Sequence, residues 1–223
     1  MCLYTQQNAT KKNVKERFNA EIEDEDSYLE ADLVKGFSYP NLPIILDTMP
    51  EIITTSFRWG LIPQWANNLD IRNYMLNAHI KTIEEKPSFR YITQNRCLII
   101  ATAYYGWRWN NDKKKTKEKY QINSQDDEIF TFAGLYNEGI NPKTGEVLNT
   151  YTILTTEANA LMKFVDKNKE TMPVILKKND ESAWLDSSNK IADFAFPYQA
   201  ARNIMILENA QKEFGKQYNF ELQ

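Results

Sequence analysis

The chain has 223 residues, a formal net charge of −3, one histidine and two cysteines, which is too few for a zinc finger or a haem-attachment motif. Its hydrophobic content of 42% and charged content of 26% are those of an ordinary globular domain, and they exclude a disordered or collagen-like chain. The slightly negative charge argues against binding nucleic acid through bulk charge, although it leaves room for a local basic groove.

The apolar runs and the cysteines of the chain indicate its location. No apolar run approaches the roughly 18 residues of a membrane-spanning helix. The N-terminal residues, MCLYTQQN, lack the apolar core of a signal peptide. We therefore expect a cytoplasmic protein with reduced thiols, and no metal or other cofactor.

The first predicted element is a helix over about residues 11–20, because Thr10 can cap it and Val14 and Phe18 fall on one face. Runs rich in β-branched and aromatic side chains then predict strands over residues 52–59, 97–107, 129–136, 151–155 and 173–176.

Five lysines within 113–119 are typical of a charged hairpin tip, with a phosphate-contacting loop as the alternative. Thr156 is expected to cap a second helix ending at Val165, and a third helix is expected near 180–185. Many strands with a few interspersed helices indicate a single α+β domain.

Cys2 is the first candidate for chemistry because of its position. If Met1 is removed, the chain begins with a thiol of pKa about 8.5 beside an α-amine of pKa about 7.7–8.0. Such an aminothiol can react twice with an aldehyde, since the amine forms an imine and the thiolate then closes a thiazolidine ring in a favourable intramolecular step. The alternative is that Cys2 is a small apolar residue near a disordered terminus.

Seven short segments accompany Met1-Cys2 in a fixed order. They are 58–65 (RWGLIPQW), 76–78 (LNA), 85–90 (EKPSFR), 96–99 (RCLI), 132–136 (FAGLY), 152–159 (TILTTEAN) and 172–176 (MPVIL). Together they resemble the SOS-response-associated peptidase family, the abasic-site processing proteins. The resemblance covers about residues 1–185, and we interpret 186–223 as an extension of the same single domain, 1–223.

The resemblance implies a fold and an activity. The expected fold is α+β, with antiparallel and mixed strands curled into a barrel-like core and a few flanking helices. The expected partner of this monomer is single-stranded DNA containing abasic sites, bound in a positively charged cleft. The family captures the ring-opened abasic aldehyde as a thiazolidine cross-link through its N-terminal cysteine.

The resemblance also implies site residues. Cys2 corresponds to the nucleophile, and Asn77 to the residue that hydrogen-bonds around the cysteine and the opened sugar. Trp65 and Trp59 are expected to stack on DNA bases, with a place in the core as the alternative for each. The expected phosphate contacts, each with a structural ion pair as its alternative, are Arg58, Arg90 and Arg96.

The sequence departs from the family where protons would be transferred. The family strand Arg-Cys-Leu-Ile-Pro-Ala-Asp-Gly-Phe-Tyr-Glu-Trp corresponds to residues 96–107, so its glutamate falls on Gly106. Losing a general acid–base typically costs about 10²–10⁴-fold in rate. The family histidine falls on Asp166 or, counted back from Met172-Pro173, on Lys169. Asp166 could orient the cysteine amine instead.

His79 is the single imidazole and stands where the family has arginine, two residues beyond Asn77. In an extended segment the two side chains share one face. We hypothesise that His79 approaches Cys2 and partly replaces the missing groups; the alternative is a surface or DNA-facing histidine.

The leading hypothesis is an abasic-site processing protein, and it requires Cys2 to lie beside Asn77 within reach of solvent. Two alternatives stay open. One is a single-stranded-DNA-binding module that keeps the cleft and lacks the chemistry, and the other is an amidohydrolase or peptidase with Cys2 as its N-terminal nucleophile.

Overall fold

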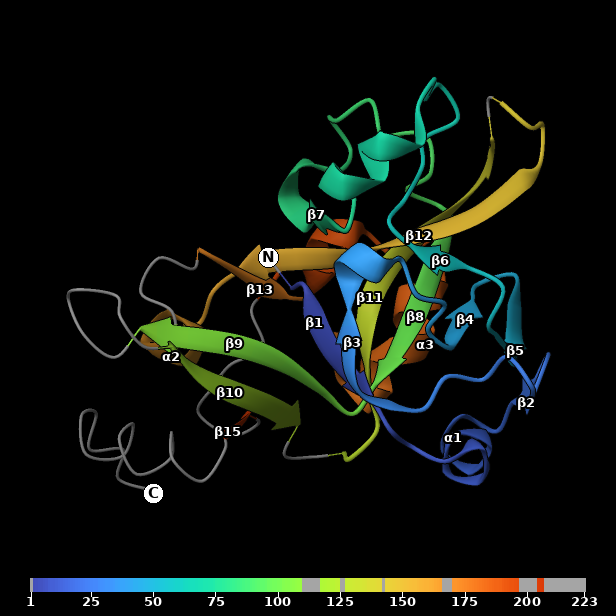
Figure 1. Cartoon of the computed structure of the whole chain (residues 1–223). Coiled ribbons are helices and arrows are strands. Elements are labelled where there is room, and N and C mark those ends of the chain that lie inside the picture. The colour runs from blue at the N-terminus through green and yellow to red at the C-terminus, as the bar shows by residue number, and fades with distance from the viewer. Residues whose placement is uncertain are drawn as a thin grey trace.

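A computed structural model describes residues 2–109, 117–124, 127–141, 143–165, 170–196 and 204–206, in which strands predominate (Figure 1). The strands are β1 (Tyr4–Gln7), β2 (Glu21–Ile22), β3 (Ala31–Lys35), β4 (Ile44–Leu46), β5 (Met49–Thr54), β6 (Arg58–Trp59), β7 (Asn77–His79), β8 (Arg96–Ala101), β9 (Ala103–Trp109), β10 (Lys117–Ser124), β11 (Phe130–Ile140), β12 (Val147–Glu157), β13 (Thr171–Pro173), β14 (Ile175–Leu176) and β15 (Ile204–Ile206).

The larger sheet has the order β13-β12-β11-β8-β4-β5-β2, with β14 paired to β11 and both β6 and β7 paired to β12. Its centre is antiparallel, whereas β6 and β7 run parallel to β12. The smaller sheet has the order β15-β10-β9-β1-β3. The α+β class is therefore confirmed, but the barrel-like closure was wrong, because both sheets keep open edges.

The chain passes from one sheet to the other at Thr102. The sequence predicts one strand over 97–107, but the ladder breaks there into β8 of the larger sheet and β9 of the smaller one. The backbone N–H of Thr102 donates to the carbonyl of Gln6 in β1, 2.9 Å away, which fixes the crossing point. Beyond it, β9 and β10 extend from the body as a long antiparallel ribbon (Figure 1).

The core has two parts, one on each face of the larger sheet. Along β8, Cys97 and Ile99 enter a cluster shared with the smaller sheet, whereas Leu98 and Ile100 enter a second cluster with α1 and α3. The same alternation occurs in β11, so residues 130–137 are buried on both faces rather than half-buried. Cys2 belongs to the first cluster, between the two sheets.

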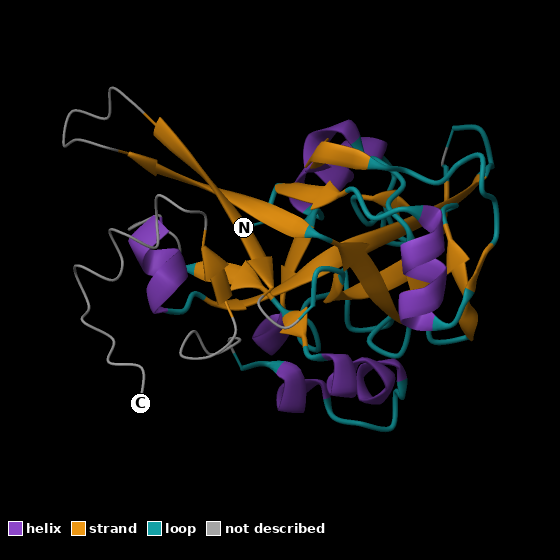
Figure 2. Cartoon of the chain, turned by 90° about the horizontal axis from the view of Figure 1, so that it is seen from below, coloured by secondary structure: helices purple, strands orange, loops and turns teal. Residues whose placement is uncertain are grey.

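The helices are short and lie at the periphery of the strands (Figure 2). They are α1 (Lys11–Phe18), α2 (Ala160–Val165) and α3 (Glu181–Leu185), with 3-10 turns η1 (Gly36–Ser38), η2 (Leu69–Tyr74), η3 (Ile80–Thr82), η4 (Lys178–Asp180) and η5 (Ile191–Phe194). None of the described helices is long and apolar enough to cross a membrane.

The caps of these helices confirm one prediction and correct another. Thr10 caps α1 as expected, since its side chain accepts a hydrogen bond from the backbone N–H of Asn13. Thr156 was the wrong cap for α2, because β12 continues through that position to pair with β13. The side chain of Asn159 caps α2 instead, accepting from the backbone N–H of Met162 at 2.9 Å. The tip of the lysine-rich hairpin, 113–116, lies outside the described residues.

Candidate functional site

Asn77 holds the backbone of Cys2 with both ends of its side-chain amide. The N–H of Cys2 donates to Oδ1 of Asn77 at 3.0 Å, and Nδ2 of Asn77 donates to the carbonyl of Cys2 at 2.7 Å. An asparagine amide offers one acceptor and a donor group, so it can satisfy a whole peptide unit as a neighbouring strand would. The structure thus brings together two residues that lie 75 positions apart in the chain.

Asn77 is positioned by the sheet. It begins β7, a three-residue strand paired with β12, in which Asn77 stands opposite Ile153. The backbone N–H of Ile153 donates to the carbonyl of Leu76, so the residue before Asn77 is also fixed. Asn77 is therefore presented by a main-chain ladder rather than by a loop, and a rigid ladder holds a side chain more closely than a loop does.

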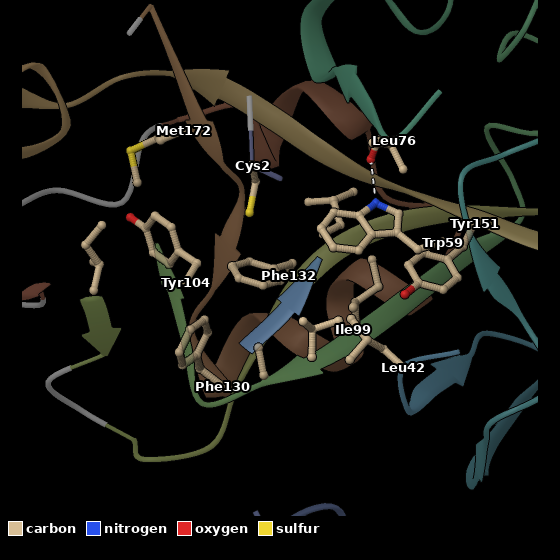
Figure 3. Close-up of a cluster of buried hydrophobic side chains, with 14 of the residues drawn as sticks. Cys2, Leu42, Trp59, Leu76, Ile99, Tyr104, Phe130, Phe132, Tyr151 and Met172 are labelled. Atoms are coloured by element: carbon tan, nitrogen blue, oxygen red, sulfur yellow. Dashed lines mark hydrogen bonds between the residues drawn. The ribbon is translucent and has the colours of Figure 1, made fainter. Parts of the chain in front are cut away.

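The sulfur of Cys2 points into the interior (Figure 3). The side chain is buried with 0% of its surface exposed, and its Sγ lies 4.0 Å from the carbonyl oxygen of Tyr4. Rings of Trp59, Tyr104 and Phe132 belong to the same cluster. Proximity to Asn77 agrees with the sequence hypothesis, but its second requirement, a thiol within reach of solvent, is not met in the chain that carries Met1.

The surroundings of Cys2 disfavour negative charge. Burial raises the pKa of Tyr104 and of Tyr151 well above the usual phenol value, and charge on Cys2 acts in the same direction on both. Burial also raises the pKa of Cys97, the second cysteine. Each of these groups is therefore neutral at physiological pH, and the interior around Cys2 is a low-dielectric one.

Two residues expected to contact DNA lie in the interior, and that expectation was wrong. Trp59 has 0% of its surface exposed and donates from Nε1 to the carbonyl of Leu76 at 2.8 Å. Arg96 has 1% of its surface exposed, and its guanidinium donates to carbonyls at the end of α3 and in the loop after it, those of residues 184, 186, 187 and 189, at 2.7–3.4 Å. Both side chains serve the core and have no surface to offer a ligand.

The other three expected DNA contacts lie at the surface. Trp65 is 54% exposed, and its Nε1 donates to the carbonyl of Pro87 at 3.4 Å, which ties its loop to the turn that carries Arg90. The guanidinium of Arg90 lies 4.5 Å from the ring centroid of Tyr91, itself 76% exposed. Arg58 is exposed on β6. Trp65, Arg90 and Tyr91 thus lie on two turns that the Trp65–Pro87 hydrogen bond joins.

His79 shares the strand β7 with Asn77, two residues away, as the sequence predicts. Its Nδ1 accepts from the backbone N–H of Lys81 at 3.3 Å, so the ring caps η3. Partial burial lowers the pKa of His79, Lys81 adds to that effect, and Glu157 opposes it. The approach of His79 to Cys2 stays a prediction, and Asp166 lies outside the described residues.

Side chains of α2 fill the space beside Gly106, the position at which the family has a glutamate. A Cβ added to Gly106 would lie 2.6 Å from Cγ1 of Val165 and 3.8 Å from Cε of Met162, both in α2. Real Cβ contacts are essentially never that short, so a side chain at position 106 requires Val165 or its helix to shift.

The sequence hypothesis overlooked Tyr104. It stands where the family strand has phenylalanine, and it adds a hydroxyl to the cluster that contains Cys2. The change from phenylalanine to tyrosine two residues before the lost glutamate was the available signal.

A cavity of about 470 Å³ lies elsewhere, beyond the far end of β1. Its polar lining consists of amides, hydroxyls and one carboxylate, including Gln6, Asn8, Gln121, Asn123 and Glu128. Across the residues that the structure describes, no group of three or more His, Cys, Asp or Glu side chains is placed to hold a metal ion.

The fold and the site define a class of protein: an α+β domain of two packed sheets in which a strand asparagine binds the backbone of a cysteine at position 2. A family model described as SOS response associated peptidase (SRAP) matches residues 1–215. The chain belongs to the SOS response associated peptidase family.

Similar proteins extend this finding. Abasic site processing protein YoqW of Bacillus subtilis (strain 168) is 40% identical over 138 residues, which cover 61% of this chain and 59% of that protein. Abasic site processing protein HMCES of Xenopus tropicalis is 29% identical over 157 residues, which cover 61% of this chain and 46% of that protein. A crystal structure of a protein from Bacteroides thetaiotaomicron is 32% identical with a TM-score of 0.83, covering 95% of this chain and 94% of that one. The match thus spans about three-fifths or less of the two named relatives.

Proposed function

We propose that this chain, once Met1 is removed, binds single-stranded DNA and captures abasic sites through Cys2 as thiazolidine cross-links. Membership of the family and the names of its relatives support the processing of abasic sites. The observation that carries the chemistry is the pair of hydrogen bonds between Asn77 and the backbone of Cys2. A free α-amine bonded to Oδ1 of Asn77 keeps its lone pair for attack and stays beside its own thiol.

The surface around Trp65 supports the DNA-binding part of the proposal. Stacking one base on an exposed aromatic ring contributes about 1–3 kcal/mol without sequence preference. Trp65 and Tyr91 expose such rings, and Arg90 and Arg58 supply charge for phosphates. This grouping suits a single strand whose bases are unpaired and turned outward.

The buried sulfur adds a condition, since capture requires the thiol to become accessible on maturation. Alkylation by iodoacetamide, followed by intact mass spectrometry, tests this directly. We expect Cys2 to react in the mature chain and to be protected in the chain that retains Met1. Cys97 is an internal control, because burial raises its pKa and keeps it inert in both forms.

The cross-link itself is tested with mature protein and an oligonucleotide carrying one abasic site, resolved on a denaturing gel after heating. We expect a heat-stable adduct from the wild type. Cys2→Ser keeps the amine but lacks the sulfur, so it should give only a heat-labile imine that borohydride traps. A heat-stable adduct from Cys2→Ser would contradict capture through the thiol.

One observation favours the alternative of a DNA-binding module without chemistry, namely the closure of position 106 by Val165. That alternative predicts salt-sensitive binding and no adduct of either kind. The peptidase alternative predicts turnover of small amides and indifference to DNA. The same mature preparation distinguishes all three outcomes.

A further inference from the structure

Tyr104 brings a hydroxyl group into the cluster that holds Cys2. It lies on β9 opposite Thr5 of β1, the strand that begins two residues after Cys2. Its ring packs edge-on against Phe132, with centroids 5.9 Å apart and an interplanar angle of 78°. Figure 3 shows Tyr104 and Phe132 in the same cluster as the sulfur of Cys2, with the hydroxyl of Tyr104 on the side of its ring away from that sulfur. The ring of Tyr104 is thus held in the same cluster as the proposed nucleophile.

The hydroxyl of Tyr104 has a weak acceptor in this structure. It donates to the thioether Sδ of Met162, 3.3 Å away, and Tyr104 is fully buried. A thioether sulfur is a poor acceptor compared with an oxygen. A buried hydroxyl bonded in this way gains free energy when an oxygen acceptor arrives. The phenol is therefore ready to bond to a substrate oxygen beside Cys2.

Tyr104 also shares a strand face with Gly106. Residues two apart on a strand point to the same side. The hydroxyl of Tyr104 and a Cβ built on Gly106 both approach Met162 of α2, at 3.3 Å from Sδ and 3.8 Å from Cε. Val165 fills the space above Gly106, and Arg108 on the same face lies over the ring of Phe164, 4.1 Å from its centroid, so the phenol is the uncharged donor of this face of β9. Burial keeps its pKa above the usual value, so it stays protonated and acts as a donor.

We propose that the Tyr104 hydroxyl is the proton donor to the substrate oxygen when Cys2 captures an abasic aldehyde, an inference that rests on the function proposed above. The Cys2 amine adds to the aldehyde carbon and gives a carbinolamine. Tyr104 then passes its proton to the carbinolamine hydroxyl while it takes the proton of the thiol, so no phenolate forms in the apolar interior. The C–O bond breaks, water leaves and Sγ bonds to the same carbon, so the products are thiazolidine, water and the original phenol.

The test compares Tyr104→Phe with Tyr105→Phe in the mature protein. Tyr105 is a matched control, because its hydroxyl donates to the carbonyl of Asp32 at 2.5 Å on the other face of β9. Single-turnover cross-linking to an abasic oligonucleotide should slow about 10²-fold in Tyr104→Phe, at the lower end of general acid catalysis. Tyr105→Phe should stay within about twofold, and non-covalent affinity for intact single-stranded DNA should be equal in all three proteins.

The outcomes separate this inference from the proposed function. A wild type that gives no Cys2-dependent adduct overturns the proposed function and the inference with it. A wild type that gives the adduct, with Tyr104→Phe equally fast across pH 5–9, overturns the inference alone. A merely structural role would lower the thermal midpoint and the DNA affinity together, whereas a proton donor changes the rate and its pH profile.

Should Tyr104→Phe fail to fold, 3-fluorotyrosine at position 104 keeps the shape and the hydroxyl while making the phenol more acidic. If Tyr104 is the proton donor, we expect the fluorinated protein to have a changed cross-linking rate and a shifted pH profile of that rate. An unchanged rate and profile in the fluorinated protein would overturn it.

Discussion

The two sides of Cys2 differ in the chemistry of their contacts. On the side of β7, Asn77 makes two hydrogen bonds to the Cys2 backbone, and the sequence keeps the asparagine of the family pattern there. On the side of β9 and α2, the pattern changes: Gly106 replaces the glutamate, and Met162 and Val165 fill the space. The first side is polar and fixed by a strand ladder, whereas the second is mostly apolar, with the hydroxyl of Tyr104 bonded to Met162 and the guanidinium of Arg108 over the ring of Phe164.

This difference indicates which part of the site tolerates change. Holding the amine requires an acceptor and a donor at fixed positions, and one asparagine provides both. Proton transfer requires only a titratable or hydroxyl group within reach, and such a group can come from a neighbouring position on the same strand face. We therefore expect the polar side of the proposed site to tolerate less change than the side of β9 and α2.

Asn77→Ala removes the polar contacts to Cys2 and, after Tyr104→Phe, should have the largest effect on cross-linking. Two hydrogen bonds of about 1 kcal/mol each are lost, so we expect cross-linking to slow by about 30-fold, measured by single-turnover gels. Asn137→Ala is the control, because Asn137 is also buried and donates to the carbonyl of Ile62 at 2.7 Å, away from Cys2. Equal slowing in both variants would mean that Asn77 acts through stability alone.

Trp65→Ala tests whether the exposed ring of Trp65 contributes to the proposed binding of DNA. Loss of one stacking ring should weaken binding to single-stranded DNA by about 1–2 kcal/mol, or about 5–30-fold, with no change in salt dependence. Trp59→Phe should behave in the opposite way, lowering the thermal midpoint while leaving affinity unchanged, because Trp59 is buried. Fluorescence anisotropy at several salt concentrations measures both. If Trp59→Phe is fully folded and still binds DNA more weakly than the wild type, Trp59 contributes to DNA binding after all.

Gly106→Ala tests the packing of the apolar side. The new Cβ would lie 2.6 Å from Cγ1 of Val165, a β-branched residue with few rotamers, so overpacking should cost about 1–2 kcal/mol in free energy of unfolding. Val165→Ala in the same chain should relieve that clash, giving a favourable coupling energy in a double-mutant cycle by urea denaturation. If the two substitutions have additive effects on the free energy of unfolding, the added methyl group does not clash with Val165.

Local patterns predict the fold class and the capped first helix, whereas the family and the pairing of Cys2 with Asn77, 75 positions away, follow from the resemblance of several segments to the family. The sequence could not predict the burial of Arg96, since the carbonyls that surround this side chain come from residues 88 to 93 positions later. The sequence around Arg96 does not show whether the guanidinium faces DNA or binds the carbonyls of a loop.

The second helix shows how tertiary pairing decides between local signals. Thr156 and Asn159 are both suitable N-cap residues, and the apolar spacing fits either. Pairing of Thr156 with Met172 in β13 extends the strand, and the helix begins only after it. The family resemblance likewise placed Trp59 near DNA, although its neighbours in the fold, Leu76 and Tyr151, enclose it.

His79→Gln should have the smallest effect. It tests whether the histidine takes part in cross-linking or only lies on the same strand as Asn77. Because burial lowers the pKa of His79, the folded state binds fewer protons than the unfolded state between that lowered pKa and about 6.5. Stability should therefore rise with pH across this interval and fall as the solution is acidified. Urea denaturation from pH 5 to 8 should show a shallower slope for His79→Gln than for the wild type.

The same variant separates His79 from Tyr104 as the proton donor. His79 shares the strand with Asn77, but its Nδ1 accepts from the backbone of Lys81, and its charged neighbours are Lys81, Glu157 and Lys86. Since those contacts bind the ring to η3, we expect cross-linking by His79→Gln to stay within about twofold of the wild type, against about 10²-fold for a lost proton donor. A fall of tenfold or more, with the acid limb of the pH profile removed, would assign proton transfer to the histidine and place the chemistry on the β7 side.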